Sequence, residues 1–153
     1  MSAQSDGDKG WKRLANLLGL ASRPKPPVGT TPADVVFAEG KWRLLRYRPK
    51  AGGPRFRTPV LLIPSLINRH YVLDLLPGKS FAAWMVEQGH DVFVIDWGTP
   101  TDEDRYVTFD DVCDRAIARA LRRTTEEAGA ERAHVLGYCL GGTLAAIHAA
   151  ARP

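Results

Sequence analysis

Residues 133–146 read Ala133-His134-Val135-Leu136-Gly137-Tyr138-Cys139-Leu140-Gly141-Gly142-Thr143-Leu144-Ala145-Ala146. The run begins with apolar residues of strand length and ends with small residues that favour a helix. Between them lies a turn with one cysteine at its tip. Gly137 and Gly141, with Gly142 beside them, allow two segments of chain to approach where a Cβ atom would clash. The run therefore predicts a strand, a tight turn that pushes the sulfur of Cys139 off the sheet edge, and a helix.

The order G-x-C-x-G-G between a strand and a helix is that of the nucleophile elbow of α/β-hydrolases, with cysteine in the place of serine. The helix that follows Cys139 directs free N–H groups and the positive end of its dipole at the sulfur, which favours the thiolate. The N–H of Leu140 is then placed to bind a developing oxyanion. The alternative interpretation is that Cys139 is only a small buried hydrophobic residue.

Outside this run, the chain alternates between strand and helix patterns. Residues 35–38 and 41–47, with a glycine turn between them, predict a β-hairpin. Residues 59–63 are a continuous apolar run typical of a buried strand in a parallel sheet, and residues 91–98 and 133–137 are interpreted as a second and a third buried strand. The order of these patterns predicts an α/β fold with a hairpin followed by parallel strands and with helices on both faces. Because five strands are found where an α/β-hydrolase has about eight, we expect an incomplete fold whose sheet ends in an exposed parallel strand.

Two helices are predicted between these strands. Ser80 caps a helix over residues 81–88 that ends at Gly89, with one face made by Phe81, Trp84, Met85 and Gln88. Thr108 begins a second helix, which Gly129 follows, and its apolar stripe is Phe109, Val112, Cys113, Ala116, Ile117, Ala120 and Leu121. Cys113 lies on that stripe and is interpreted as a core thiol. The loop over residues 64–77 is long, so it is either functional or contains a short helix.

The 153 residues divide into a basic N-terminal segment with a Pro-rich linker (1–31) and a partial α/β domain (32–153). Residues 1–57 hold 12 Lys and Arg but only 4 Asp and Glu. Residues 11–20 predict a short amphipathic helix that either packs on the domain or anchors a partner or an apolar surface. No nucleic-acid motif accompanies the basic segment, so nucleic acid is not an expected partner.

Several classes of protein are excluded by composition. The sequence has no apolar run of 18 residues, so no transmembrane helix is expected, and its N-terminus is a poor secretory signal. Its 2 cysteines form neither a disulfide framework nor a metal site. A reducing, cytoplasmic setting is therefore expected, and a reactive thiol would need one.

Three further motifs indicate a family. They are Thr31-Pro32-Ala33-Asp34-Val35-Val36 leading into Leu44-Leu45-Arg46-Tyr47, then Asn68-Arg69-His70-Tyr71-Val72-Leu73-Asp74-Leu75-Leu76-Pro77 with Ser80 following, and Val94-Ile95-Asp96-Trp97-Gly98-Thr99-Pro100. Together with the elbow they resemble the polyhydroxyalkanoate synthases, bacterial enzymes that polymerise 3-hydroxyacyl-CoA thioesters. The form Ile-Asp-Trp-Gly looks most like the short synthases that work with a second subunit. The elbow also resembles that of dienelactone hydrolases, but the flanking motifs favour the synthases.

The resemblance implies an acyltransferase in which Cys139 carries the growing chain, a downstream His acts as the base and a downstream Asp assists that His. Leu140 N–H would be one oxyanion donor, and the second would come from just after the first parallel strand, from Leu66 or alternatively Ser65. The CoA thioester is the substrate, and neither a cofactor nor a metal is expected. The implied partners are a second synthase subunit or a homodimer, and the surface of the polymer granule.

The sequence departs from this pattern because Pro153 follows soon after Cys139. We therefore expect an N-terminal portion of a synthase that is inactive alone, because the Asp and His lie beyond it. Among the histidines, only His70 on the long loop could substitute as a base. His134 is expected to face a packed helix, His90 lies at the opposite edge, and His148 is about 13 Å along a helix from Cys139. The alternatives are a dienelactone-type hydrolase, and a non-catalytic split or decayed fragment that binds a partner or granule.

Overall fold

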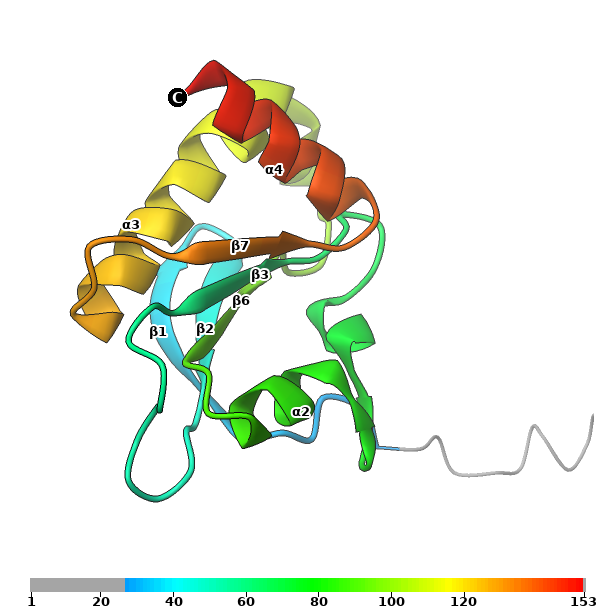
Figure 1. The fold of residues 1–153 in the computed structure, drawn as a ribbon. Coiled ribbons are helices and arrows are strands. Elements are labelled where there is room, and N and C mark those ends of the chain that lie inside the picture. The colour runs from blue at the N-terminus through cyan, green and yellow to red at the C-terminus, as the bar shows by residue number, and fades with distance from the viewer. Residues whose placement is uncertain (1–26, 153) are drawn as a thin grey trace, which may run out of the picture.

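The computed structural model describes residues 27–152, so the expected helix over residues 11–20 lies outside them. Figure 1 shows how the described elements are arranged. In chain order they are β1 (Ala33–Glu39), β2 (Trp42–Tyr47), β3 (Val60–Ile63), the 3-10 helix η1 (His70–Leu73), β4 (Asp74–Leu76), β5 (Lys79–Ser80), α2 (Phe81–Glu87), β6 (Val92–Asp96), the 3-10 helix η2 (Asp102–Tyr106), the π-helix η3 (Asp111–Ala116), α3 (Ile117–Ala128), β7 (His134–Gly137) and α4 (Leu140–Ala151).

The main sheet has the strand order β1-β2-β6-β3-β7. The predicted hairpin is confirmed as β1 and β2, which pair antiparallel, and β2 pairs antiparallel with β6. The predicted parallel strands are confirmed as β6, β3 and β7, with Leu62 opposite both Val94 and Leu136. Because these three strands run in the same direction, the residues that follow them meet at one edge of the sheet.

Helices cover both faces of the sheet, as predicted (Figure 1). Alternate strand residues point to opposite faces, so Leu61 and Phe93 pack in one cluster with residues of η3, α3 and α4. Leu62 and Val94 pack in the other cluster, with residues of α2. Within residues 27–152, no helix has both the length and the apolar character needed to cross a membrane.

Helix α2 begins and ends as predicted, but it buries a different face. Ser80 Oγ accepts a hydrogen bond from Ala83 N at 2.9 Å, and Gly89 follows the helix with φ +95°. The buried residues of the helix are Ala82, Met85 and Val86. The predicted face is therefore wrong: Phe81 and Trp84 are 37% and 51% exposed, and their rings stack on each other with centroids 6.0 Å apart.

The helix that follows Thr108 contains a π-helical segment, η3, directly after its first two residues, which the sequence did not predict. Thr108 N donates to Asp111 Oδ2 at 2.9 Å, and Asp111 N donates to Thr108 Oγ1 at 3.2 Å. Gly129 ends α3 with φ 62°. Most of the predicted stripe is buried or half-buried, including Cys113, but Phe109 is 57% exposed. Cys113 is thus part of the core.

Strand β7 is less buried than predicted. It is the last strand of the sheet within the described part of the chain, so it has a neighbouring strand on one side only. His134 and Val135 are exposed, and the expectations that His134 faces a packed helix and that β7 is fully buried are wrong. The exposed parallel edge that the strand count predicted is present.

The long loop after β3 contains a short helix, one of the two predicted outcomes. It is η1, followed by a two-stranded antiparallel sheet of β4 and β5. The buried side chain of Asp74 accepts from Thr31 N at 2.9 Å and from Thr31 Oγ1 at 2.6 Å. These hydrogen bonds therefore connect this segment, beside α2, to the start of the described chain.

Candidate active site

Cys139 occupies an exposed turn between β7 and α4. Its backbone has φ 55° and ψ −127°, and it is the only non-glycine residue with a positive φ among residues 27–152. The turn is closed by hydrogen bonds from Gly141 N to Tyr138 O (3.0 Å) and from Gly142 N to Cys139 O (2.9 Å). A positive φ costs energy for a residue with a side chain. This strand, strained turn and helix have the geometry of a nucleophile elbow.

The three glycines around Cys139 lie where the backbone is most crowded. A Cβ atom on Gly141 would overlap Ile63 O and would lie 2.8 Å from Pro64 O. A Cβ on Gly137 would overlap Gly142 Cα, whereas one on Gly142 would lie 3.2 Å from Gly137 O. The first turn of α4 therefore packs directly on the backbone at the end of β3.

The segment after β3 is held beside the elbow by its own contacts. Tyr138 N donates to Ile63 O at 2.9 Å. Trp97 Nε1 donates to Pro64 O at 2.9 Å in a buried contact. Ser65 is fully buried, and its Oγ accepts from Ile67 N at 3.2 Å. The structure thus brings the segment that includes Leu66 to the start of α4, where Leu140 is the first residue and has no helical partner for its N–H.

His70 lies against a buried carboxylate. Its Nδ1 is 3.1 Å from Asp96 Oδ1, without the alignment of a hydrogen bond. Arg43 Nη2 donates to Asp96 at 2.8 Å, and Gly98 N donates at 3.1 Å. Burial raises the pKa of Asp96, but the Gly98 N–H, His70 and Arg43 outweigh it, so the pKa is lowered overall. Asp96 ends β6, and β3 separates β6 from β7, so Asp96 is about 10 Å across the sheet from the elbow strand.

The other three histidines also have their own surroundings. His148 Nδ1 is 2.8 Å from Cys113 O. His90 precedes β6 and stacks on Phe56, with ring centroids 4.6 Å apart. His134 is exposed at the start of β7. None of these contacts involves Cys139. In the described residues, no group of three or more His, Cys, Asp or Glu is placed to hold a metal ion.

The sequence alone suggested no role for Asp96 or Trp97, although both belong to the motif over residues 94–100. Trp97 is 7% exposed, and a buried indole N–H needs an acceptor. An aspartate at the end of a buried strand and a tryptophan directly after it were the available signal. Their partners are far away in sequence, so the pattern alone could not identify what they hold.

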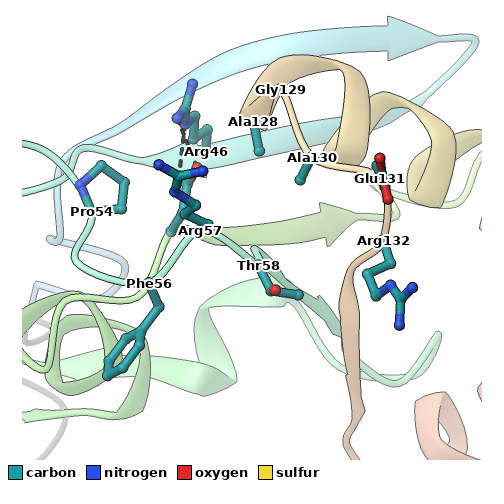
Figure 2. A pocket seen from close by; sticks show the side chains of 11 residues that line it. Arg46, Pro54, Phe56, Arg57, Thr58, Ala128, Gly129, Ala130, Glu131 and Arg132 are labelled. Carbon is teal, nitrogen blue, oxygen red and sulfur yellow. Dashed lines mark hydrogen bonds and ion pairs between the residues drawn. The ribbon is translucent and has the colours of Figure 1, made fainter.

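A hollow of about 630 Å³ does not belong to this site, and Figure 2 shows the side chains that line it. It is lined by Arg46, Arg57, Arg132 and Asp91 among others. Arg46 is already paired with Asp91 through two hydrogen bonds of 2.9 and 2.8 Å. Asp91 and Arg132 precede β6 and β7. The hollow therefore lies at the N-terminal ends of the parallel strands, whereas Cys139 follows the C-terminal end of β7.

Two family models match the chain. Residues 26–85 match "Poly-beta-hydroxybutyrate polymerase (PhaC) N-terminus". Residues 58–153 match "alpha/beta hydrolase fold". The two matches overlap over residues 58–85, which include β3, the long loop and the first part of α2.

Curated relatives extend the first match through the elbow. The chain is 41% identical to the poly(3-hydroxyalkanoate) polymerase subunit PhaC of Haloferax mediterranei, over 94% of this chain and 30% of that one. It is 35% identical to the PhaC subunit of Synechocystis, over 92% of this chain and 36% of that one. It is 38% identical to the PhaC subunit of Cupriavidus necator, over 76% of this chain and 20% of that one. The chain thus spans about a third of these relatives or less.

A solved structure supports the fold. An ester hydrolase from the metagenome of Lake Arreo matches with a TM-score of 0.53 and 21% identity, over 91% of this chain and 44% of that chain. At this identity the likeness concerns the fold alone. The strand order, the family models and the relatives agree: the chain belongs to the α/β-hydrolase fold family and, within it, corresponds to an N-terminal portion of the polyhydroxyalkanoate synthases.

Proposed function

We propose that this chain carries the nucleophile of an acyltransferase that polymerises 3-hydroxyacyl-CoA thioesters through an acyl group on Cys139. The observation that carries the proposal is the strained, exposed backbone of Cys139 at φ 55°. Such strain is kept where a side chain must be held in one place. The matched relatives, named as poly(3-hydroxyalkanoate) polymerases, supply the class of reaction.

In the proposed reaction, the thiolate of Cys139 attacks the thioester carbonyl and forms a new C–S bond. The bond to CoA breaks, and CoA leaves and takes up a proton. The hydroxyl of a second 3-hydroxyacyl group then attacks the acyl-cysteine, which forms an ester, returns the thiolate and gives the hydroxyl proton to a base. A thiolate both attacks and leaves readily, so it suits repeated transfer of this kind, and the steps need no cofactor.

Two backbone N–H groups are proposed to bind the oxyanion. Leu140 N–H lies at the start of α4, and the second donor is Leu66 N–H, with Ser65 as the alternative. Their support is the packing of Gly141 against Ile63 and Pro64, which brings the two segments together. Preorganised donors of this kind lower the barrier to acyl transfer.

The base is proposed to come from outside residues 27–152. The four histidines of the sequence lie in the described part, and each contacts another group or the solvent: His70 at Asp96, His148 at Cys113, His90 at Phe56, and His134 exposed at the edge. Alone, the chain would take one acyl group from CoA and would not cycle.

The proposed partners are a second synthase subunit or a second copy, and the surface of a polymer granule in the cytoplasm. Leu75, Phe81 and Trp84 are 45%, 37% and 51% exposed beside β4 and α2. An apolar surface of this kind suits a protein or polymer contact.

The test is to incubate the protein, purified as its cell makes it, with 3-hydroxybutyryl-CoA and to map acyl adducts by peptide mass. We expect one adduct on Cys139 and release of CoA. Cys139→Ala should lose both, and the matched variant Cys113→Ala should keep both, because Cys113 is buried and burial, with Asp110, raises the pKa of its thiol.

Three outcomes would contradict the proposal. An adduct that persists in Cys139→Ala would place the nucleophile elsewhere. Lactone hydrolysis without CoA release would favour the dienelactone-type hydrolase. Granule association that survives Cys139→Ala, in a protein that releases no CoA, would favour a non-catalytic role.

A further inference from the structure

The turn after β6 contacts the segment that follows β3. Trp97 is buried in this turn, and its Nε1 donates to Pro64 O at 2.9 Å across 33 positions of sequence. The adjacent Asp96 lies against His70, further along the same loop. One turn therefore braces the loop after β3 at two points.

The Pro64 carbonyl lies between two other segments of chain. On one side, it receives the Trp97 indole N–H. On the other, the first turn of α4 is so close that a Cβ on Gly141 would lie 2.8 Å from Pro64 O. The residue before Pro64 is also fixed, since Ile63 O accepts from Tyr138 N at 2.9 Å. The direction of the Pro64 carbonyl is thus set from several sides, and Trp97 supplies the hydrogen bond.

This direction determines where the next N–H groups point. The peptide between Pro64 and Ser65 is planar, so a fixed Pro64 carbonyl fixes the Ser65 N–H on its opposite side. Ser65 is fully buried and its Oγ accepts from Ile67 N at 3.2 Å, which also restrains Leu66 between them. The orientation of both candidate oxyanion donors therefore depends on the Pro64 carbonyl.

We infer that Trp97 is a positioning residue for acyl transfer: its indole N–H holds the Pro64 carbonyl so that the backbone N–H of Leu66 or Ser65 faces the oxyanion formed at Cys139. This inference rests on the proposed function and names the residue that sets its oxyanion donors. Without the indole N–H, the buried carbonyl is left unpaired, and the peptide turns to find another donor. The donors then move although Cys139 and its helix do not.

Trp97→Phe removes the N–H and keeps an aromatic ring. We expect the rate of Cys139 acylation at saturating 3-hydroxybutyryl-CoA to fall about 10²-fold, with KM changed less than about 2-fold. Alkylation of Cys139 by iodoacetamide forms no oxyanion, so its rate should stay at the wild-type value. Trp42→Phe is the matched control, because Trp42 packs in the same core cluster against Phe37. It should change neither rate.

A second variant covers the case in which Trp97→Phe does not fold. 3-Benzothienylalanine at position 97 matches the shape of tryptophan and has no N–H, and we expect the same loss of acylation. Wild-type acylation rates in both variants, or alkylation that falls in parallel with acylation, would overturn the inference while the proposed function stands. A wild-type protein that forms no acyl-Cys139 at all would refute the proposed function itself, and the inference with it.

Discussion

Replacing Gly141 with alanine is expected to push the start of α4 away from the end of β3. The added Cβ would meet the backbone of Ile63 and would lie 2.8 Å from Pro64 O. Neither neighbour can move aside as the tip of a flexible side chain would, because Ile63 O is bonded to Tyr138 N and Pro64 O to Trp97. The helix must therefore shift.

The expected change in the free energy of unfolding of Gly141→Ala follows from two opposing effects. Alanine is favoured over glycine in a helix by about 1 kcal/mol, whereas overpacking a well-packed site costs about 1–3 kcal/mol or more. Because both obstructing atoms are backbone, we expect the upper end of that cost, a net loss of about 2 kcal/mol in the free energy of unfolding. Acylation of Cys139 should also fall about 10²-fold, as expected for a displacement near 1 Å.

Urea unfolding followed by tryptophan fluorescence measures the first effect, and peptide mass measures the second. Gly142→Ala is the matched control, the same change one position along the helix. Its Cβ would lie 3.2 Å from Gly137 O, which a shift of a few tenths of an ångström relieves, so its stability should stay within about 1 kcal/mol of wild type. If Gly141→Ala is as stable as Gly142→Ala, the close approach of α4 to β3 is not as described.

Two further predictions concern stability. The pKa of Asp96 is lowered in the folded protein. At a pH above its pKa in the unfolded chain, near 4, ionised Asp96 therefore stabilises the fold. This stabilisation is lost as the pH falls through the lower pKa of the folded protein. The stability difference between wild type and Asp96→Asn should therefore shrink between pH 6 and pH 2.5 in urea titrations, and a growing difference would contradict the ion cluster. Ser80→Ala removes the hydrogen bond that caps α2 and should lower the free energy of unfolding by about 1 kcal/mol. Ser80→Asn can still cap the helix, so it should keep most of that stability.

The elements that could be predicted from sequence are those with local causes. The hairpin has strand residues on both sides of Gly40, and the observed β1 and β2 match it. Ser80 and Gly89 mark the two ends of α2 because each acts on backbone within a few residues. The turn at Cys139 is equally local, since its hydrogen bonds join Tyr138 to Gly141 and Cys139 to Gly142.

The buried face of α2 could not be chosen by periodicity. In a helix this short, the sets at 81, 84, 85 and 88 and at 82, 85 and 86 both fit a spacing of three to four. Hydrophobicity favours the first set, but the structure buries the second, in which Ala82 is fully buried against the sheet cluster. Phe81 and Trp84 instead cover each other. Which face a helix buries depends on the space above the sheet, which other segments determine.

Burial of the elbow strand was overestimated for a related reason. An apolar run predicts a strand, but its burial depends on how many neighbours the strand has. β7 pairs with β3 alone in the described sheet, so His134 and Val135 are exposed. Their position is set by strand order, which no pattern within residues 133–137 encodes.

The contact made by Gly141 could be predicted from the sequence only in part. A glycine beside Cys139 implies that some backbone comes close, but the sequence does not say which. The structure identifies it as Ile63 and Pro64, and then shows that Trp97 bonds the same Pro64 carbonyl. Three segments far apart in sequence thus meet at one peptide group, and we predict that a change at Trp97 alters the proposed oxyanion donors more than the thiol. The rates of acylation and of alkylation at Cys139 separate these effects, because only acylation would depend on the proposed donors.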